Sequence, residues 1–222
     1  TNQKILYSSK FNLNNSTKGQ IISSKGIFYD IDGVNKIINI KQDDPSDWIF
    51  FKNIDFTNWS INFDGKINNL IGKNISQRFN TNGLTGCLNF FNSLFDNTSI
   101  IMNDGGCEDS VNIIDSNGSI KSVYIKDAFS DGLDLDFSTL SIDSLFVTNA
   151  GNDCFDVSGG QYSIILADLS RCNDKALSIG EISEFNATKV IVSISDIGVS
   201  VKDFSRSSIF NYKASSVNVC AE

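Results

Sequence analysis

Six aspartates fall within a short stretch in the second half of this sequence, and five of them keep a step of twenty-two residues. The six are Asp109, Asp131, Asp153, Asp134, Asp156 and Asp136. Carboxylates held in pairs can act as general acid and base on a glycosidic bond, accept hydrogen bonds from sugar hydroxyls, or bind a hard cation such as Ca²⁺. The repeated step predicts that these side chains lie together, and we therefore look for function there.

Two more aspartates, Asp174 and Asp196, continue the first series with a slip of one residue, which predicts a local bulge. Carboxylates stacked about 5 Å apart repel one another, so at least one pKa should rise unless a cation or hydrogen-bond donors intervene. A structural alternative is that the aspartates cap turns. This alternative explains the aspartates at turn positions better than it explains Asp134, Asp136 and Asp156. Those three lie in predicted strands, where aspartate is depleted.

Short strands must position these residues. Polar positions that we expect to face outward recur at the same step, at Asn112, Asp134, Asp156, Ser178 and Ser200. A second series follows two residues later, at Ile114, Asp136, Ser158, Gly180 and Lys202. Apolar residues alternate with them, as Val111 and Ile113 do around Asn112. Strict alternation is typical of a strand with one buried face.

A constant period near twenty residues predicts that each strand is one turn of a solenoid. A second apolar series with the same step, Ile120, Ile142 and Ile164, supplies another strand to each coil. Helical periodicity is absent. We therefore predict an all-β fold, a single-stranded right-handed parallel β-helix with coils of about 22 residues, in which residues one coil apart are about 4.8 Å from each other.

The regular repeat does not cover the whole chain, although we expect residues 1–222 to form one β-helix domain. Residues 108–209 are predicted to form the regular coils, and residues 1–107 more irregular coils with longer loops. Residues 210–222 are expected to form a C-terminal edge that a partner covers or at which a longer protein was cut. Strand-like runs in the irregular part are Gln20–Ser23, Lys36–Ile40, Trp48–Phe51, Ile61–Phe63, Cys87–Phe91 and Ser99–Met102.

The amino-acid composition argues against several classes of binding partner for this protein. The net charge of −8 and the lack of a basic patch argue against nucleic acid. The sequence has no apolar stretch long enough to span a membrane. It contains 0 histidines, so a bound metal would be a hard cation on oxygen ligands, with Ca²⁺ the leading candidate.

The 5 cysteines are Cys87, Cys107, Cys154, Cys172 and Cys220. An odd number without a CxxC spacing argues against a zinc site or a dense disulfide scaffold. We expect them to be buried small apolar residues, with one disulfide between neighbouring coils as the alternative.

Four segments, each about one coil apart, resemble the motifs of the polygalacturonases, which are pectin-lyase-like β-helices. The segments are Ser130-Asp131-Gly132-Leu133-Asp134, Gly151-Asn152-Asp153-Cys154, Lys175-Ala176-Leu177-Ser178-Ile179-Gly180 and Val199-Ser200-Val201-Lys202. The resemblance implies that Asp131 and Asp153 match two family carboxylates and that Lys202 matches the substrate-binding lysine. The positions of the family acid, histidine and arginine hold Asn152, Lys175 and Ser200. Polygalacturonase-type hydrolysis is therefore not expected.

The phrases Glu108-Asp109-Ser110-Val111-Asn112 and Asp131-Gly132-Leu133-Asp134-Leu135-Asp136 are more similar to β-helix modules of bacterial surface proteins, some of which lie beside spore-coat-protein-H-type domains. This resemblance implies the fold and an extracytoplasmic setting, and it names no reaction.

These observations predict an extracellular module, or one at a cell or virion surface, that engages polysaccharide through an acidic column. Candidate catalytic residues and candidate Ca²⁺ ligands are the same four, Asp131, Asp134, Asp153 and Asp156. Candidate substrate-binding residues are Asp136, Lys175, Glu181 and Lys202. A structural subunit of a surface layer, appendage or phage tail, acting as a homo-oligomer or as part of a larger protein, is the alternative. A glycan hydrolase or lyase with non-standard residues is the third possibility.

Overall fold

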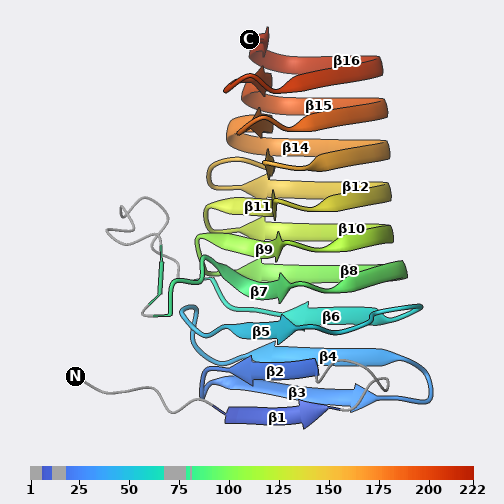
Figure 1. Ribbon diagram of the computed structural model, residues 1–222. Coiled ribbons are helices and arrows are strands. Elements are labelled where there is room, and N and C mark those ends of the chain that lie inside the picture. The colour runs from blue at the N-terminus through green and yellow to red at the C-terminus, as the bar shows by residue number, and fades with distance from the viewer. Residues whose placement is uncertain (1–6, 12–18, 68–78, 81) are drawn as a thin grey trace.

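The computed structural model describes residues 7–11, 19–67, 79–80 and 82–222. Its sixteen strands belong to one sheet that winds into a β-solenoid of about 8 turns (Figure 1). The described residues form no helix, and thus none that could cross a membrane. The predicted parallel β-helix is confirmed.

One column of strands runs along the length of the solenoid (Figure 1). Its parallel members are β4 (Ile37–Gln42), β6 (Ser60–Asp64), β8 (Leu94–Gly105), β10 (Asn117–Ala128), β12 (Thr139–Ala150) and the first part of β14 (Gln161–Gly180). The inward residues of this column are the predicted apolar series, because Ile120 pairs with Ile142, and Ile142 with Ile164.

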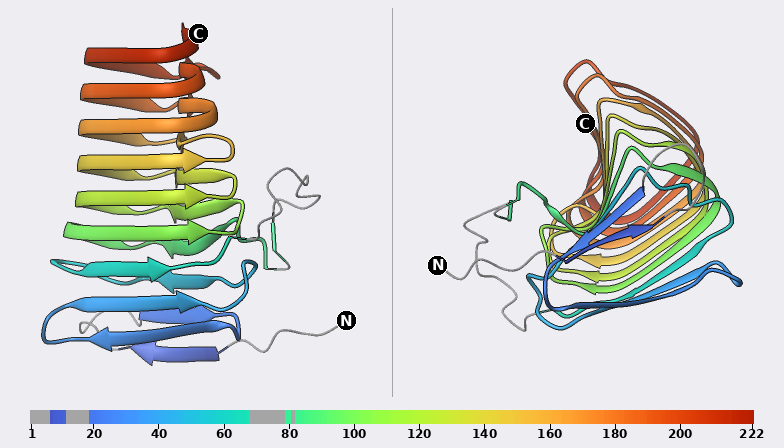
Figure 2. Two further views of the ribbon diagram at one scale, coloured as in Figure 1. Left: turned by 180° about the vertical axis from the view of Figure 1, so that it is seen from behind. Right: turned by 60° about the horizontal axis from the view of Figure 1, so that its bottom comes forward.

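A second column of shorter strands carries the repeated aspartates. Its parallel members are β5 (Ile49–Lys52), β7 (Gly86–Phe91), β9 (Asp109–Ile114), β11 (Asp131–Asp136) and β13 (Phe155–Ser158). In the last coils the two columns merge into the long strands β14, β15 (Glu184–Val201) and β16 (Arg206–Ala221), which bend around the corner of the coil (Figures 1 and 2).

The predicted register is confirmed by the strand pairing. Asp109 pairs with Asp131, and Asp134 pairs with both Asn112 and Asp156. The slip anticipated near Asp174 is also present, since the pairing of β14 with β15 shifts between Cys172 and Lys175. Side chains one coil apart are therefore direct neighbours.

The N-terminal end differs from the parallel coils. Strand β2 (Gly19–Ser23) pairs antiparallel with both β1 (Tyr7–Phe11) and β5, and β3 (Ile27–Asp32) pairs antiparallel with β4. The β3–β4 hairpin closes through Asp32 Oδ1, which accepts the backbone N–H groups of Val34 and Asn35 at 3.0 Å each. Figure 2 shows these strands lying across the end of the stack, where they provide edge strands with partners.

A cluster of stacked aromatic rings fills the core of the early coils. Phe51 stacks on Phe90 with ring centroids 5.4 Å apart, and Phe56 stacks on Phe95 at 5.6 Å. Edge-to-face contact between Phe56 and Phe90, at 5.2 Å, joins the two pairs. The stacking therefore follows the coil-to-coil direction, as the parallel register requires.

Asparagine and aspartate occupy several corners where the backbone has a positive φ. Asn92 Nδ2 donates to Asn53 Oδ1 at 2.8 Å, and Asn97 Nδ2 donates to Asn58 Oδ1 at 2.7 Å. All four of these residues have φ between 47° and 62°. Asparagine tolerates a positive φ better than most residues. The same residue type therefore suits both the backbone conformation of the corner and the side-chain hydrogen bonds between coils.

Candidate functional site

The repeated acids gather at the corner of the coil that leads into β9, β11 and β13. We call this cluster the acidic corner and define it by Glu108, Asp109, Asp131, Asp134, Asp136, Asp153 and Asp156. The first residues of β9 and β11 are Asp109 and Asp131, and Glu108 directly precedes β9. Parallel pairing between coils brings these residues together from three neighbouring strands.

Two of the turn aspartates tie successive coils together. Asp131 Oδ1 accepts the Asn152 side-chain amide at 2.7 Å and the Asp153 backbone N–H at 2.9 Å. Asp153 Oδ1 accepts the Lys175 backbone N–H at 2.8 Å. Each carboxylate thus satisfies a donor of the next coil, which gives these two candidates a structural role whatever else they do.

The polar column that was expected to face outward is recessed, which corrects that expectation. Asn112, Ser178 and Ser200 are only 1%, 0% and 3% exposed. Short side chains stacked at strand spacing cover one another, and Asn112 Nδ2 also donates to Asp134 Oδ2 at 3.1 Å and to Asp136 Oδ2 at 2.9 Å. Asp134, Asp136 and Asp156 are half-buried, so no member of this part of the column is fully exposed.

Three carboxylates of the acidic corner converge closely enough to share a cation. Glu108, Asp109 and Asp131 each present one oxygen, and these oxygens lie within 4.8 Å of one another. Ligands at 2.3–2.6 Å from one Ca²⁺ lie at most about 5 Å apart, so the spacing fits that ion. Asp131 belongs to both this group and the predicted ligand set, whereas Asp134, Asp153 and Asp156 lie outside the group.

Buried side-chain oxygens without a hydrogen-bond donor lie at the acidic corner and beside it. The Asp109 side chain is 1% exposed, and its Oδ2 accepts no hydrogen bond from any described residue, although Thr85 bonds the same carboxyl group. Asn112 Oδ1, also 1% exposed, is without a donor among the described residues. A buried carboxylate oxygen without a donor is costly, and a cation would remove that cost.

Electrostatics in the acidic corner disfavour full ionisation. Burial raises the pKa of Asp109 well above its ordinary value, and Glu108 and Asp131 raise it further. Burial likewise raises the pKa of Asp134, with Asp109, Asp136 and Asp156 adding repulsion. The effects on Asp131 partly cancel, because hydrogen bonds from Asp153 and Asn152 oppose burial, and its pKa reaches about 6. The corner therefore shares protons near neutral pH unless a cation binds.

Lys175 forms an ion pair with one carboxylate of the acidic corner. Its Nζ lies 3.6 Å from Asp153 Oδ1 and forms a closer ion pair with Asp174. Burial works against the charge of Lys175, but both carboxylates outweigh it and raise the pKa of the ammonium group. Among the described residues, the ion pairs of Lys175 are with Asp153 and Asp174 and not with Asp134 or Asp156.

Of the remaining candidates, Glu181 lies near the acidic corner, whereas Lys202 lies beside Gly180, farther along the solenoid. Glu181 and Lys202 are exposed. Burial raises the pKa of Asp136, the hydrogen bond from Asn112 opposes that effect, and the charges of Asp156 and then Glu181 raise the pKa further. Glu108 was not among the predicted site residues. A signal for it existed, because Glu108-Asp109 stands one coil before Ser130-Asp131, at the same corner.

Two disulfides cross this corner of the solenoid. Cys87 bonds Cys107, and Cys154 bonds Cys172, whereas Cys220 is free and exposed. The expectation of free buried cysteines is wrong for these four residues, which form disulfides, and for Cys220, which is exposed. The spacings of 20 and 18 residues are slightly less than one coil, so each pair meets across the same bend in adjacent coils.

We expect Asp134→Asn to stabilise the metal-free protein at pH 7.5 by roughly 1–3 kcal/mol, because it removes a crowded charge. The asparagine keeps an oxygen that can accept the Asn112 amide. Urea unfolding followed by circular dichroism measures the change, with Asp143→Asn on the exposed face of β12 as the matched control. A loss of stability in Asp134→Asn alone would show that its charge is compensated in the folded protein.

Comparisons with protein-family models, with curated proteins and with solved structures found no match to this chain. The fold defines its class, a parallel β-solenoid.

Proposed function

We propose that this protein is an extracellular or surface β-helix module that binds Ca²⁺ at the acidic corner and engages polysaccharide beside it. The observation that carries the proposal is the convergence of Glu108, Asp109 and Asp131, together with the unpartnered buried Oδ2 of Asp109. All three ligands are carboxylates, which suits a hard cation. Bound Ca²⁺ would supply positive charge that offsets the repulsion in the corner.

The disulfides support an oxidising compartment, because such bonds persist in secreted and surface proteins and are rare in the cytosol. The resemblance to pectin-lyase-like β-helices is part of the same proposal. It is supported by the hydrogen bonds that link Asp131, Asp153 and Lys175 in three successive coils. These are the positions at which the polygalacturonase-like motifs were noted.

Calcium titration tests the cation site directly. Isothermal titration of metal-free protein should show saturable binding, and Asp109→Asn should weaken it at least tenfold, because it removes one ligand charge. Asp143→Asn carries the same change on an exposed strand and should bind as the wild type does. Circular dichroism establishes that both variants are folded. Equal affinity in the two variants would contradict the site.

Polysaccharide binding is tested separately, by affinity electrophoresis through gels that contain single glycans, with Ca²⁺ or with EDTA. We expect retardation that weakens in EDTA. The same glycans incubated with the protein should release no reducing ends and no unsaturated products. Release of either would replace the binding function with the hydrolase or lyase alternative.

The assembly alternative has one specific observation in its favour. Among the described strands, β16 pairs with β15 alone, and Phe204 just before it and Phe210 within it are 93% and 90% exposed. An open strand edge can template pairing with another chain. Light scattering at increasing protein concentration should give the monomer mass if the module acts by binding glycan, and defined oligomers if assembly is its function.

A further inference from the structure

A groove with a volume of about 760 Å³ follows the bend between the long column of strands and the short one. We call it the corner groove. Its wall contains residues from five successive coils, here represented by Phe129, Asn149, Arg171, Ile194 and Ser216. Neighbouring coils are about 4.8 Å apart, so the groove is roughly 19 Å long. It therefore suits an elongated ligand that lies along the solenoid.

The groove is continuous because each coil bends in the same way. Four of the wall residues, one in each of four successive coils, have φ between 54° and 66°. The four are Asn149, Arg171, Ile194 and Ser216. A small buried residue follows three of these bends, and parallel pairing joins Ala150 to Cys172 and Cys172 to Ser195. The bends therefore lie over one another from coil to coil.

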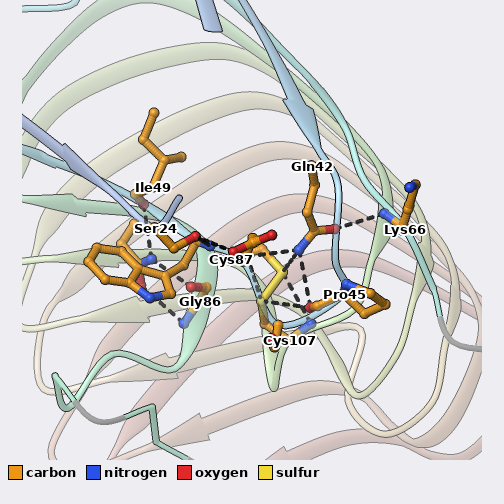
Figure 3. Close-up of a disulfide and its surroundings, with 12 residues drawn as sticks. Ser24, Gln42, Pro45, Ile49, Lys66, Gly86, Cys87 and Cys107 are labelled. Carbon is orange, nitrogen blue, oxygen red and sulfur yellow. Dashed lines mark hydrogen bonds between the residues drawn. A yellow bond between two sulfur atoms is a disulfide. The ribbon is translucent and has the colours of Figure 1, made fainter. Parts of the chain in front are cut away.

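The groove does not continue into the coil of β8 and β9. Gly106 occupies the bend there, and a Cβ at this position would lie 2.5 Å from the Lys66 backbone oxygen and 2.7 Å from Pro45 Cβ. Figure 3 shows Gln42 between these two residues. Its Oε1 accepts the Lys66 backbone N–H at 2.7 Å, and its Nε2 donates to Pro45 O at 3.1 Å. The bend of that coil is thus covered, and the groove begins at the next one.

The wall of the corner groove combines hydrogen-bonding groups with apolar surface. Arg171 and Asn173 are exposed, and their side chains have no hydrogen bond or ion pair with any described residue. A guanidinium group offers five donors, and a primary amide offers two donors and an acceptor. Phe129 is half-buried and Ile194 is 54% exposed, so both present accessible apolar surface. A sugar ring has hydroxyl groups around apolar C–H faces, which matches this combination.

Other wall residues are fixed before any ligand arrives. Asn149 Nδ2 donates to Asp127 Oδ1 at 2.6 Å, one coil away. Asn218 Nδ2 donates in the same way to Asp196 Oδ1 at 2.7 Å. The Cys154–Cys172 disulfide holds two adjacent coils together at this bend. A wall that is already ordered lowers the entropic cost of binding.

Strand pairing favours a glycan over an extended peptide as the ligand. A peptide commonly adds to a free strand edge through its backbone. The coils that form the groove are already paired on both sides, as Cys172 is with Ala150 and Ser195. Recognition in the groove must therefore use side chains, which suits a polymer whose hydrogen-bonding groups are hydroxyls.

We infer that the corner groove binds a linear glycan chain along the axis of the solenoid. This inference rests on the proposed glycan-binding function and locates the chain. Arg171 and Asn173 bind its hydroxyl groups, and Phe129 and Ile194 contact the faces of its rings.

Calorimetric titration of the folded protein tests the groove. The probes are β-1,4-linked oligosaccharides of glucose, of N-acetylglucosamine and of galacturonic acid, each with one, two, four and six units, and a flexible Gly-Ser-Asn peptide. Affinity for the glycan that binds should rise with chain length. Arg171→Ala and Asn173→Ala should each weaken the binding roughly fivefold or more, the effect of one lost hydrogen bond.

Matched variants separate the groove from the rest of the surface. Arg206→Ala and Asn186→Ala change exposed residues of the same types outside the groove and should leave the affinity unchanged. Ile194→Asn should weaken binding and keep the fold, because asparagine tolerates a positive φ and occupies the equivalent bend at Asn149. Circular dichroism establishes that each variant is folded.

A single sugar unit that binds as tightly as the hexasaccharide would overturn the inference, and so would a preference for the peptide. Glycan binding that survives all three groove variants, or that the two matched variants weaken equally, would also overturn it. Those two results would leave the proposed glycan-binding function in place, with the glycan elsewhere on the protein. Failure of the wild type to bind any of the glycans would remove both proposals.

Discussion

The metal-free protein should become more stable as the pH falls from 7.5 to about 5, the reverse of ordinary acid destabilisation. Burial raises the pKa of Asp131 from 3.8 to about 6, so the folded protein binds this proton more tightly than the unfolded chain does. A group whose pKa is higher in the folded protein contributes its full stabilisation at a pH below its pKa in the unfolded chain. That stabilisation is lost as the pH rises through its pKa in the folded protein. For Asp131 alone the gain is at most about 3 kcal/mol.

Asp109 and Asp134 act in the same direction, because their pKa values are raised as well. Urea midpoints measured from pH 4.5 to 8 in EDTA give the profile, and saturating Ca²⁺ should flatten it by favouring the ionised corner. Asp131→Asn should flatten the metal-free profile between pH 4 and 6. Stability that rises with pH in EDTA would contradict the charge crowding described here.

Loss of the Cys154–Cys172 disulfide should lower the free energy of unfolding by about 3 kcal/mol, as expected for a closed loop of this length. The paired replacement Cys154→Ala and Cys172→Ala removes the cross-link without leaving a buried thiol. The bond joins adjacent coils at the corner that carries Asp153, so its loss should also weaken calcium binding.

Urea unfolding of the double variant gives the stability, and calorimetry gives the calcium affinity. Cys220→Ala provides the control, since this exposed cysteine forms no disulfide. A thiol assay under denaturing conditions should find one free thiol in the wild type. Five free thiols, together with an unchanged urea midpoint in the double variant, would contradict the cross-link.

The register between neighbouring coils could be predicted from the sequence because it depends on two periods. These are the two-residue alternation along a strand and the twenty-two-residue step between coils. Alternation decides that Val111 and Ile113 belong to the apolar core, and the twenty-two-residue step decides that Asp134 stacks on Asp156. Both follow from strand geometry alone. The slip near Asp174 could be predicted for the same reason, since Asp174 departs by one residue from the step, which resumes at Leu177 and Ser178.

Antiparallel pairing at the N-terminal end could not be predicted from the repeat, because hairpins do not follow its step. A local signal was nevertheless present, since Asp32-Gly33 separates two alternating runs and is a common turn sequence. The convergence of Glu108 with Asp109 and Asp131 depends on how the corner bends. The recessed position of Asn112 depends on the side chains stacked on either side, which periodicity does not describe.

The hydrogen-bonded asparagine pairs at the corners of the coils bear on how this protein could gain whole coils during evolution. Asn92 and Asn97 each find a partner in the equivalent corner of the preceding coil, Asn53 and Asn58. Tandem duplication of one whole coil would present the same donors and acceptors to both neighbours, and no new connection would be needed. Insertions of whole repeats should be tolerated during evolution, whereas partial ones would put every subsequent corner out of phase.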